Sequence, residues 1–212
     1  LNPHIKVIGV EPAGAACMKA SLEKGEVVTL PHVNTIADGT AVQTPGSHIF
    51  PYIQENLDEI ITVEDDELIV AFLDMVENHK MIVENSGLLT VAALRHLDFK
   101  NKKVVSILSG GNMDVITMSS VVQHGLIQRD RIFTVSVLIP DKPGELVRVA
   151  SIIAENQGNV IKLDHNQFVS TNRNAAVELK ITLEAFGTDH KNQIVKALET
   201  AGCRPKVIRA SL

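Results

Sequence analysis

The run Lys103-Val-Val-Ser-Ile-Leu-Ser-Gly-Gly-Asn112 carries the clearest fold signal in the chain. Its first six residues are mostly apolar and β-branched, which is typical of a strand buried on both faces of a sheet. Ser109-Gly110-Gly111-Asn112 then turns the chain, and the apolar run that follows predicts a helix ending near His124, with Gly125 as its C-cap. A buried strand, a turn and a helix form the repeating unit of a parallel α/β sheet.

The same alternation extends back to the start of the chain. Helices are expected at 13–24, stopped by Gly25, then from 65 onward and from 87 to 97. Thr62 and Asp65 resemble a capping box for the second of these helices. The residues between 30 and 51 contain prolines and glycines, yet enough apolar side chains to predict an ordered loop. Strands are expected at 5–10, 26–29, 59–63, 81–83 and 103–108, and the second helix should bury Leu68, Ile69, Phe72, Met75 and Val76.

The last third of the chain has a different order of elements. Acidic residues are in excess before residue 130 and basic residues after it, which indicates a domain boundary close to the polar stretch 125–131. Beyond it the pattern predicts βαββαβ, a ferredoxin-like layer of two helices on an antiparallel sheet. The expected domains are 1–128, an α/β unit with an open, mostly parallel sheet covered by helices, and 129–212. Strands are expected at 133–139, 159–165, 175–183 and 204–209, and helices at 145–156 and 188–201.

Composition excludes several classes of protein. The 212 residues are 45% hydrophobic and 21% charged, so the chain should fold, and no apolar run is long enough for a membrane helix. Only 3% of residues are aromatic and the net charge is −5, which disfavours nucleic acid as a partner. The only two cysteines, Cys17 and Cys203, rule out a disulfide framework and favour a reducing compartment, so we expect a cytoplasmic protein.

Two candidate site segments follow predicted strands of the first domain. The Ser109–Asn112 turn is either a generic strand-to-helix turn or a ligand turn, since ligands of open α/β sheets bind at the carboxyl ends of strands. Glu84 is either an acid placed favourably at a helix N-terminus or a carboxylate pointing into the crevice at the same sheet edge. In the second domain, the exposed amides of the Asp141–Leu146 turn could hold the carboxylate of a small ligand.

Four segments in order carry a family resemblance: Val7-Ile8-Gly9-Val10-Glu11-Pro12, Thr35-Ile36-Ala37-Asp38-Gly39-Thr40-Ala41-Val42, Ile82-Val83-Glu84-Asn85-Ser86-Gly87 and Ile107-Leu108-Ser109-Gly110-Gly111-Asn112. Together they resemble threonine dehydratase (threonine ammonia-lyase). That family carries pyridoxal 5'-phosphate on the fold shared with tryptophan synthase β and serine racemase. The resemblance therefore implies a lyase that converts L-threonine to 2-oxobutanoate and ammonia by β-elimination.

The resemblance also assigns cofactor-binding residues. Ser109 matches the serine whose hydroxyl meets the pyridine nitrogen, Gly110 and Gly111 match the glycines that let the cofactor lie close, and Glu84 matches an acidic residue near the ring face. Glu11 matches a metal-ligand carboxylate of serine racemase. Because Cys17 stands where that enzyme's second carboxylate falls, we expect no metal site.

The second domain contains Asp141-Lys-Pro-Gly-Glu-Leu146 and Gly158-Asn-Val-Ile161, and with these segments it resembles an ACT domain, a regulatory module for small ligands. The resemblance implies that an amino-acid or nucleotide effector binds between paired modules of a homo-oligomer. The residues implied for that regulatory site are Asp141, Pro143, Gly144, Glu145, Leu146, Asn159, Val160 and Ile161.

The Ser-Phe-Lys motif with the family's Schiff-base lysine does not occur in the 212 residues, and neither does its glycine tetrad. In the family both precede the segment that matches residues 5–10. The chain also begins with Leu1, one step before a predicted buried strand. We therefore expect a C-terminal portion of a dehydratase, with no catalytic residue in this segment and no activity by itself. Two alternatives remain: a non-catalytic amino-acid-sensing protein with a degenerate lyase core, or a serine dehydratase or racemase of the same fold.

Overall fold

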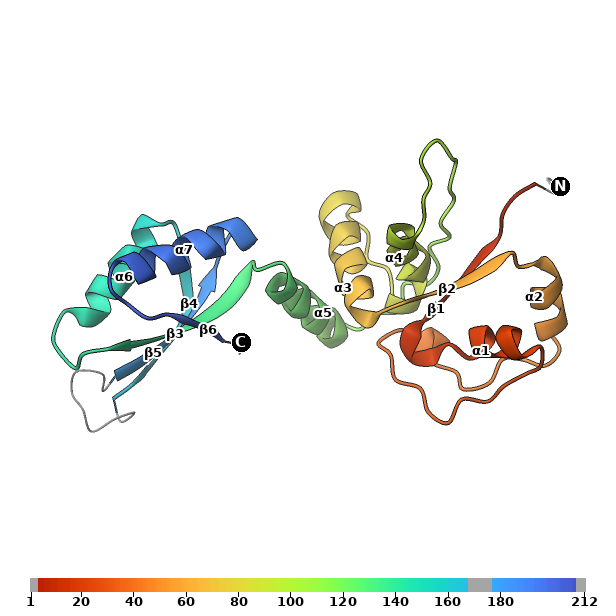
Figure 1. Ribbon diagram of the computed structural model, residues 1–212, viewed down its shortest axis with the longest axis horizontal. Helices are drawn as coiled ribbons and strands as arrows, with labels where there is room; N and C mark the ends of the chain where they lie inside the picture. The colour runs from red at the N-terminus through yellow and green to blue at the C-terminus, as the bar shows by residue number, and fades with distance from the viewer. Residues whose placement is uncertain (1–3, 168–176, 209–212) are drawn as a thin grey trace. The chain divides into compact units, whose positions relative to one another are not determined.

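The computed structural model describes residues 4–167 and 177–208 (Figure 1). The chain divides into two compact units, residues 1–122 and 123–212, and each has its own buried apolar core. The division falls within helix α5 (Val115–Gln128). This helix runs through Gly125, which was predicted to end it. Arg129 N–H donates to the Gly125 carbonyl, so the helical hydrogen bonding simply continues past the glycine.

The first unit is built around a parallel pair of strands. Strand β1 (Ile8–Pro12) pairs with β2 (Glu59–Val63), with Ile8 opposite Glu59 and Pro12 opposite Val63. A 3₁₀ turn follows β1 and leads into helix α1 (Cys17–Lys24). Gly25, with φ of +79°, ends α1 as predicted.

The long segment after α1 is ordered, as its apolar content predicted. Residues 38–40 form a 3₁₀ turn, and Ala37 beside them is fully buried. Leu30 N–H donates to the Gln43 carbonyl, which closes the loop on itself. Helix α2 (Phe50–Asn56) then leads into β2.

Helix α3 (Asp65–Asp74) continues into a π-helical turn, Met75–His79. The predicted apolar stripe on it is confirmed, because four of its five side chains are buried and Val76 packs against the same core. The predicted cap is wrong. Glu67, and not Asp65, accepts a hydrogen bond from the backbone N–H of Glu64, since β2 extends through Thr62.

Three predicted strands of the first unit do not form a ladder. Residues 26–29, 81–83 and 103–108 have extended or irregular backbone, and only β1 and β2 pair among the described residues of this unit. In place of a neighbouring strand, the last segment contacts α4 (Leu89–Ala92). Thr90 Oγ1 donates to the Ile107 carbonyl over 2.9 Å. A strand needs a partner for its backbone groups, which an apolar pattern alone does not supply.

The second unit has the predicted βαββαβ order. Its elements are β3 (Ile132–Ile139), α6 (Glu145–Glu155), β4 (Asn159–Asn166), β5 (Val177–Glu184), α7 (Thr188–Thr200) and β6 (Lys206–Ile208). Neighbouring strands are antiparallel in the order β4-β5-β3-β6. Residues 175, 176 and 209, which were predicted to belong to strands, lie outside the described residues.

Both helices of the second unit cover one face of the sheet (Figure 1). Alternate residues of β5 enter the core, so Leu179 and Ile181 are buried while Lys180 between them is exposed. Ile153 of α6 and Leu198 of α7 are completely buried against them. Each such side chain contributes about 1.5–3 kcal/mol through removal of apolar surface from water.

Candidate functional site

Glu84 and the Ser109–Asn112 turn are brought together in the first unit. Glu84 is half-buried, and its Oε2 atom accepts a hydrogen bond of 3.0 Å from the backbone N–H of Asn112. Glu84 precedes the 3₁₀ turn Asn85–Leu88, but its side chain makes no capping hydrogen bond there. The carboxylate is therefore directed to the turn and not to the helix end beside it.

Two glycines make this close approach possible. Gly110 has φ of +79°, and a Cβ atom on it would lie 2.1 Å from Glu84 Oε1. A Cβ atom on Gly87 would lie 1.7 Å from the Ser109 carbonyl oxygen. No other residue fits at either position without a shift of its surroundings.

Ser109 lies at the surface of the first unit. The residue is exposed, and none of the residues that the structure describes hydrogen-bonds to its hydroxyl. At Gly111, an added Cβ would meet nothing nearer than the Ile82 carbonyl oxygen at 4.0 Å. The turn thus combines an uncommitted hydroxyl with backbone that a flat group can approach.

Asp65, which the sequence analysis placed only in a helix cap, contributes to the structure of this region. Its carboxylate accepts hydrogen bonds from Thr35 Oγ1 (2.6 Å) and from the Ile36 backbone N–H (3.0 Å). Asn85 Nδ2 donates to the Ile36 carbonyl over 3.1 Å. Asp65 and Asn85 therefore hold the loop that contains Asp38 against the segment that contains Glu84. An acidic residue in the first turn of a helix is common, so nothing in the sequence indicates that Asp65 contacts a loop 29 positions away.

A cavity of about 430 Å³ opens beside Glu84. The loop at 35–38, Glu84 with Asn85, and the first turns of α5 form its walls. Asn85, a lining residue, and its neighbour in sequence Ser86 each have a buried side-chain oxygen, Oδ1 and Oγ respectively, without a hydrogen-bond partner among the described residues. The polar lining residues are Thr35, Asp38, Glu84, Asn85, Asn112, Asp114, Thr117 and Ser120, and the apolar ones are Ile36, Met113, Ile116 and Val121.

Glu11 has a structural role at the start of helix α1. Its carboxylate accepts hydrogen bonds of 2.8 Å from the backbone N–H groups of Met18 and Lys19, at the start of α1. Burial raises the pKa of Glu11 and outweighs these two hydrogen bonds, which lower it. Burial, followed by the nearby charge of Glu11, also raises the pKa of Cys17. Within residues 4–167 and 177–208, no group of three or more His, Cys, Asp or Glu side chains is arranged to hold a metal ion.

The two segments expected to form the regulatory site lie apart within one chain. Asp141–Leu146 follows Ile139, which pairs with Val177. Asn159 begins β4 opposite Glu184, at the other end of β5. Within the first segment, Gly144 has φ of +91°, and the Glu145 carboxylate is bound by Arg148 over 2.7 Å. Pro143 and Leu146 flank these two residues, while Val160 and Ile161 follow Asn159 along the exposed β4.

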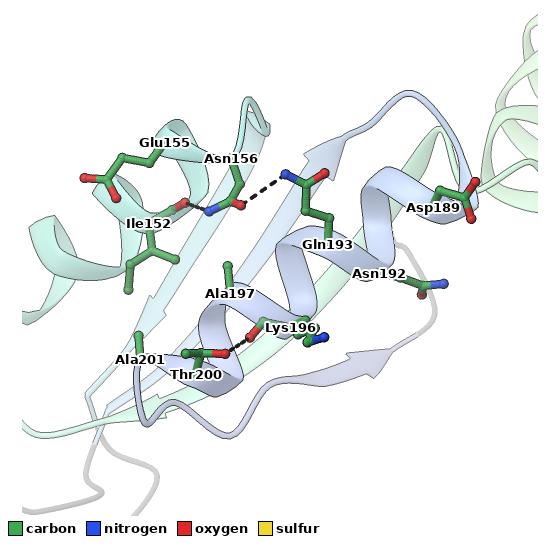
Figure 2. A pocket seen from close by; sticks show the side chains of 10 residues that line it. All are labelled: Ile152, Glu155, Asn156, Asp189, Asn192, Gln193, Lys196, Ala197, Thr200 and Ala201. Carbon is green, nitrogen blue, oxygen red and sulfur yellow. Dashed lines mark hydrogen bonds between the residues drawn. The ribbon is translucent and has the colours of Figure 1, made fainter.

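A second hollow lies between α6 and α7 (Figure 2). Its polar side chains are partly bonded to each other and to the helices. Gln193 Nε2 donates to Asn156 Oδ1, and Thr200 Oγ1 donates to the Lys196 carbonyl. No buried polar side chain without a partner occurs there among the described residues. No helix in the described parts of the chain has the length and apolar character needed to span a membrane.

Comparison with known proteins defines the class to which these features belong. Residues 1–110 match the family described as "Pyridoxal-phosphate dependent enzyme". The chain belongs to this family, and pyridoxal phosphate is the family's cofactor.

Individual proteins similar to this chain have more specific names than the family. The chain is 37% identical over 210 residues to an L-threonine ammonia-lyase of Geobacter sulfurreducens and 32% identical over 209 residues to one of Thermotoga maritima. Each alignment covers 98% of this chain but 52% of the relative, so the chain spans about half the length of these curated relatives. Among solved structures, it is similar to processed threonine deaminase isoform 2 of Solanum lycopersicum. The TM-score is 0.54 and the identity 36%, over 58% of this chain and 35% of the other. Maize serine racemase gives a TM-score of 0.52 and 34% identity, over 58% of this chain and 41% of that one.

The residues of the 109–112 turn fit the ring end of this cofactor. Ser109 supplies a neutral hydroxyl without a partner among the described residues, which suits a pyridine nitrogen. The open space at Gly111 admits a flat ring, and the Glu84 carboxylate is already fixed beside it by Asn112. The sequence contains no glycine tetrad that could serve the phosphate end.

Proposed function

We propose that the whole protein is a pyridoxal-phosphate-dependent threonine ammonia-lyase, which converts L-threonine to 2-oxobutanoate and ammonia. Residues 1–128 would supply the C-terminal portion of its catalytic domain. The observation that carries this proposal is the Glu84 carboxylate seated on the Ser109–Asn112 turn. The names of the relatives at 37% and 32% identity support the choice of threonine as substrate.

In this proposal each residue of the turn has a separate task. Bound pyridoxal phosphate supplies an electron sink for β-elimination from an amino acid. The Ser109 hydroxyl would donate a hydrogen bond to the ring nitrogen, and being neutral it would not force that nitrogen to hold a proton. Gly111 would leave room for the ring, Gly110 leaves room for the Glu84 carboxylate, and Glu84 would hold that carboxylate at the face of the ring. The Schiff-base lysine is proposed to come from polypeptide that precedes this segment, which alone is expected to be inactive.

We also propose that residues 129–212 are an ACT regulatory domain of ferredoxin-like topology. The βαββαβ order and the strand order β4-β5-β3-β6 support this assignment. Because Asp141–Leu146 and Asn159–Ile161 lie at opposite ends of the sheet, an amino-acid or nucleotide effector that contacts both would take them from two copies. The proposal therefore includes a homo-oligomer. A coupling free energy of about 1–3 kcal/mol would be enough for regulation.

The assignment of Ser109 is tested by Ser109→Ala in the whole protein. One lost hydrogen bond costs about 0.5–1.5 kcal/mol, so the affinity for pyridoxal phosphate should fall roughly two- to tenfold. Titration of the cofactor's visible absorbance measures this affinity. Ser106→Ala is the matched control, because the Ser106 hydroxyl already donates a hydrogen bond to the Thr90 carbonyl and is not proposed to contact the cofactor. Equal cofactor affinity in all three proteins would remove Ser109 from the site.

A preference for serine is the second candidate function. The similarity to maize serine racemase favours it. Rates of ammonia release from L-threonine and from L-serine, compared in the whole protein, decide between the two. A higher kcat/KM for L-serine, or conversion of L-serine to its enantiomer, would replace the proposed function.

A further inference from the structure

The segment 103–108 of the first unit alternates between inward and outward side chains. The Ser106 hydroxyl donates to a backbone carbonyl of α4, and Leu108 packs against the apolar core. Val105 and Ile107, which alternate with these two residues, are 87% and 71% exposed. Because successive side chains of extended backbone point to opposite sides, Val105 and Ile107 lie on one outward face. Two large apolar side chains are thus left in water on the same face of the segment.

The backbone of this segment lacks strand partners among the described residues. None of residues 103–108 forms a backbone-to-backbone hydrogen bond with another described residue. The Ile107 carbonyl does accept from the Thr90 hydroxyl, which satisfies one of the segment's backbone groups. Extended apolar backbone with unpaired N–H and C=O groups is the kind of surface on which another strand adds, and native proteins normally pair or cover it.

The sheet of the first unit is small for its type. Strands β1 and β2 are parallel, and no third strand joins them among the described residues. Parallel sheets occur almost only where both faces are covered, and two strands alone are marginally stable. The first unit therefore has fewer strands than its parallel pairing calls for, while the apolar segment 103–108 stands without a partner.

Polypeptide outside the 212 residues is the best candidate to cover this face. The two L-threonine ammonia-lyases that are 37% and 32% identical to the chain match 98% of it, yet the chain covers only 52% of each relative. About half of each relative therefore has no counterpart in this chain. A covalently linked stretch also has an effective concentration of about a millimolar, which favours it over a second copy of the chain. An apolar, extended stretch fits both the unpaired backbone and the two exposed side chains.

We propose that, in the whole protein, polypeptide preceding Leu1 packs against residues 103–108 and covers Val105 and Ile107. The occupant belongs to the same chain and not to a second copy. The inference rests on the proposed function in one respect, the expectation that catalytic polypeptide precedes this segment. It goes beyond that expectation because it names the surface at which the two parts of the chain meet.

Thiol labelling of the whole protein measures whether this face is covered. Val105→Cys and Ile107→Cys are prepared separately, and the rate of reaction with iodoacetamide is measured at each introduced cysteine by peptide mass spectrometry. Each rate is compared with that of the same variant unfolded in urea. We expect the folded protein to react at least about tenfold more slowly at both positions, because a covered thiol reacts only when the structure opens.

Two other cysteines calibrate the labelling. Ser151→Cys, at an exposed position of α6, should react at close to the rate of the unfolded protein. Native Cys17 is buried in the first unit and should stay protected in every variant, which shows that this unit is folded. Protection below the expected value at either Val105→Cys or Ile107→Cys, while Cys17 stays protected, would overturn the proposal.

Photochemical cross-linking identifies what covers the face. A diazirine-bearing aliphatic amino acid is placed at position 105 of the whole protein, and isotopically light and heavy chains are refolded together. We expect cross-links from position 105 to residues that precede Leu1, within one isotopic form. Cross-links between light and heavy chains would identify a second copy as the occupant, and cross-links only to residues 1–212 would identify a contact inside the segment. Either result would overturn the proposal.

These measurements separate the covered face from the proposed function. They need neither cofactor nor substrate, whereas the proposed function is tested by ammonia release from L-threonine. A protected face in a protein without that activity would refute the function and leave the interface standing. An exposed face in an active protein would do the reverse.

Discussion

The Glu84 carboxylate and the backbone N–H of Asn112 are joined by a 3.0 Å hydrogen bond across 28 positions of the chain. Gly110 lies between the two partners in the sequence, and a Cβ atom added to it would overlap the same carboxylate. The hydrogen bond holds Asn112, the last residue of the turn, whereas Ser109, its first residue, is exposed. The side chain proposed to face the cofactor ring therefore also shapes the turn that presents the hydroxyl.

Replacing Gly110 by alanine should destabilise the first unit more than its backbone angle alone explains. Gly25→Ala is the matched control, because Gly25 has the same φ of +79° with nothing within 4 Å of an added Cβ. The control should lose about 1–2 kcal/mol for the left-handed conformation. Gly110→Ala should lose about 1–3 kcal/mol more from overlap with Glu84. Urea unfolding followed by circular dichroism measures both.

The double variant Gly110→Ala with Glu84→Ala separates the two causes. Removing the Glu84 carboxylate makes room for the new methyl group, so the double variant should recover most of the extra loss. If Gly110→Ala and Gly25→Ala were equally destabilised, the close approach of Glu84 to the turn would be refuted.

Asp65→Ala should loosen the loop at 35–40 as well as destabilise α3. The variant loses the acceptor of Thr35 Oγ1 and of the Ile36 N–H, at a cost of about 2–3 kcal/mol for charge-assisted bonds. Asp66→Ala is the control, because exposed Asp66 occupies the same first turn and has the same relation to the helix dipole. Hydrogen exchange of the Ile36 amide should accelerate strongly in Asp65→Ala and little in Asp66→Ala. Equal acceleration in both variants would mean that Asp65 acts only through the helix.

The sequence predicted the second unit better than the first, and the reason is physical. In residues 129–212 each strand has its partners within the unit, so local alternation and global pairing agree, as β5 between β3 and β4 shows. In the first unit the run at 103–108 has strong strand character but no ladder partner among the described residues. Val105 and Ile107 are consequently 87% and 71% exposed. Pairing is a non-local property that periodicity does not encode.

The candidate site could be predicted only in part for a similar reason. From the order of the predicted elements, Glu84 and Ser109 were expected at the same edge of the sheet. The structure adds the geometry, in which Glu84 accepts a hydrogen bond from the backbone N–H of Asn112. The roles of Asp65 and of the Asn85 amide depend on contacts 29 and 49 positions distant, which no local motif marks. Likewise the cap formed by Glu64 and Glu67 was missed, because Thr62, the residue predicted to cap the helix, lies within the strand β2 and the helix begins only at Asp65.

Acid should weaken the second unit through Asp130. Its carboxylate accepts hydrogen bonds of 2.8 Å from both Lys191 Nζ and Thr188 Oγ1. Burial alone would raise the pKa of Asp130, but these two partners and the charge of Lys191 outweigh burial and lower it. A depressed carboxyl pKa stabilises the fold above the ordinary value of about 3.9, and this contribution disappears as the pH falls through the folded-state pKa.

Asp130→Asn isolates this contribution in urea unfolding at a series of pH values. Charge-assisted hydrogen bonds of this kind are worth about 1.5–3 kcal/mol, so the wild-type protein should exceed the variant by about 2 kcal/mol at pH 6. The difference should shrink below pH 4 and approach zero near pH 2, because the protonated carboxyl resembles the amide. Asp164→Asn is the control, since its 3.9 Å pair with Lys162 is exposed on both sides and should contribute little at any pH. A wild-type advantage over Asp130→Asn that stays constant from pH 6 to pH 2 would show that the Asp130 charge does not stabilise the fold.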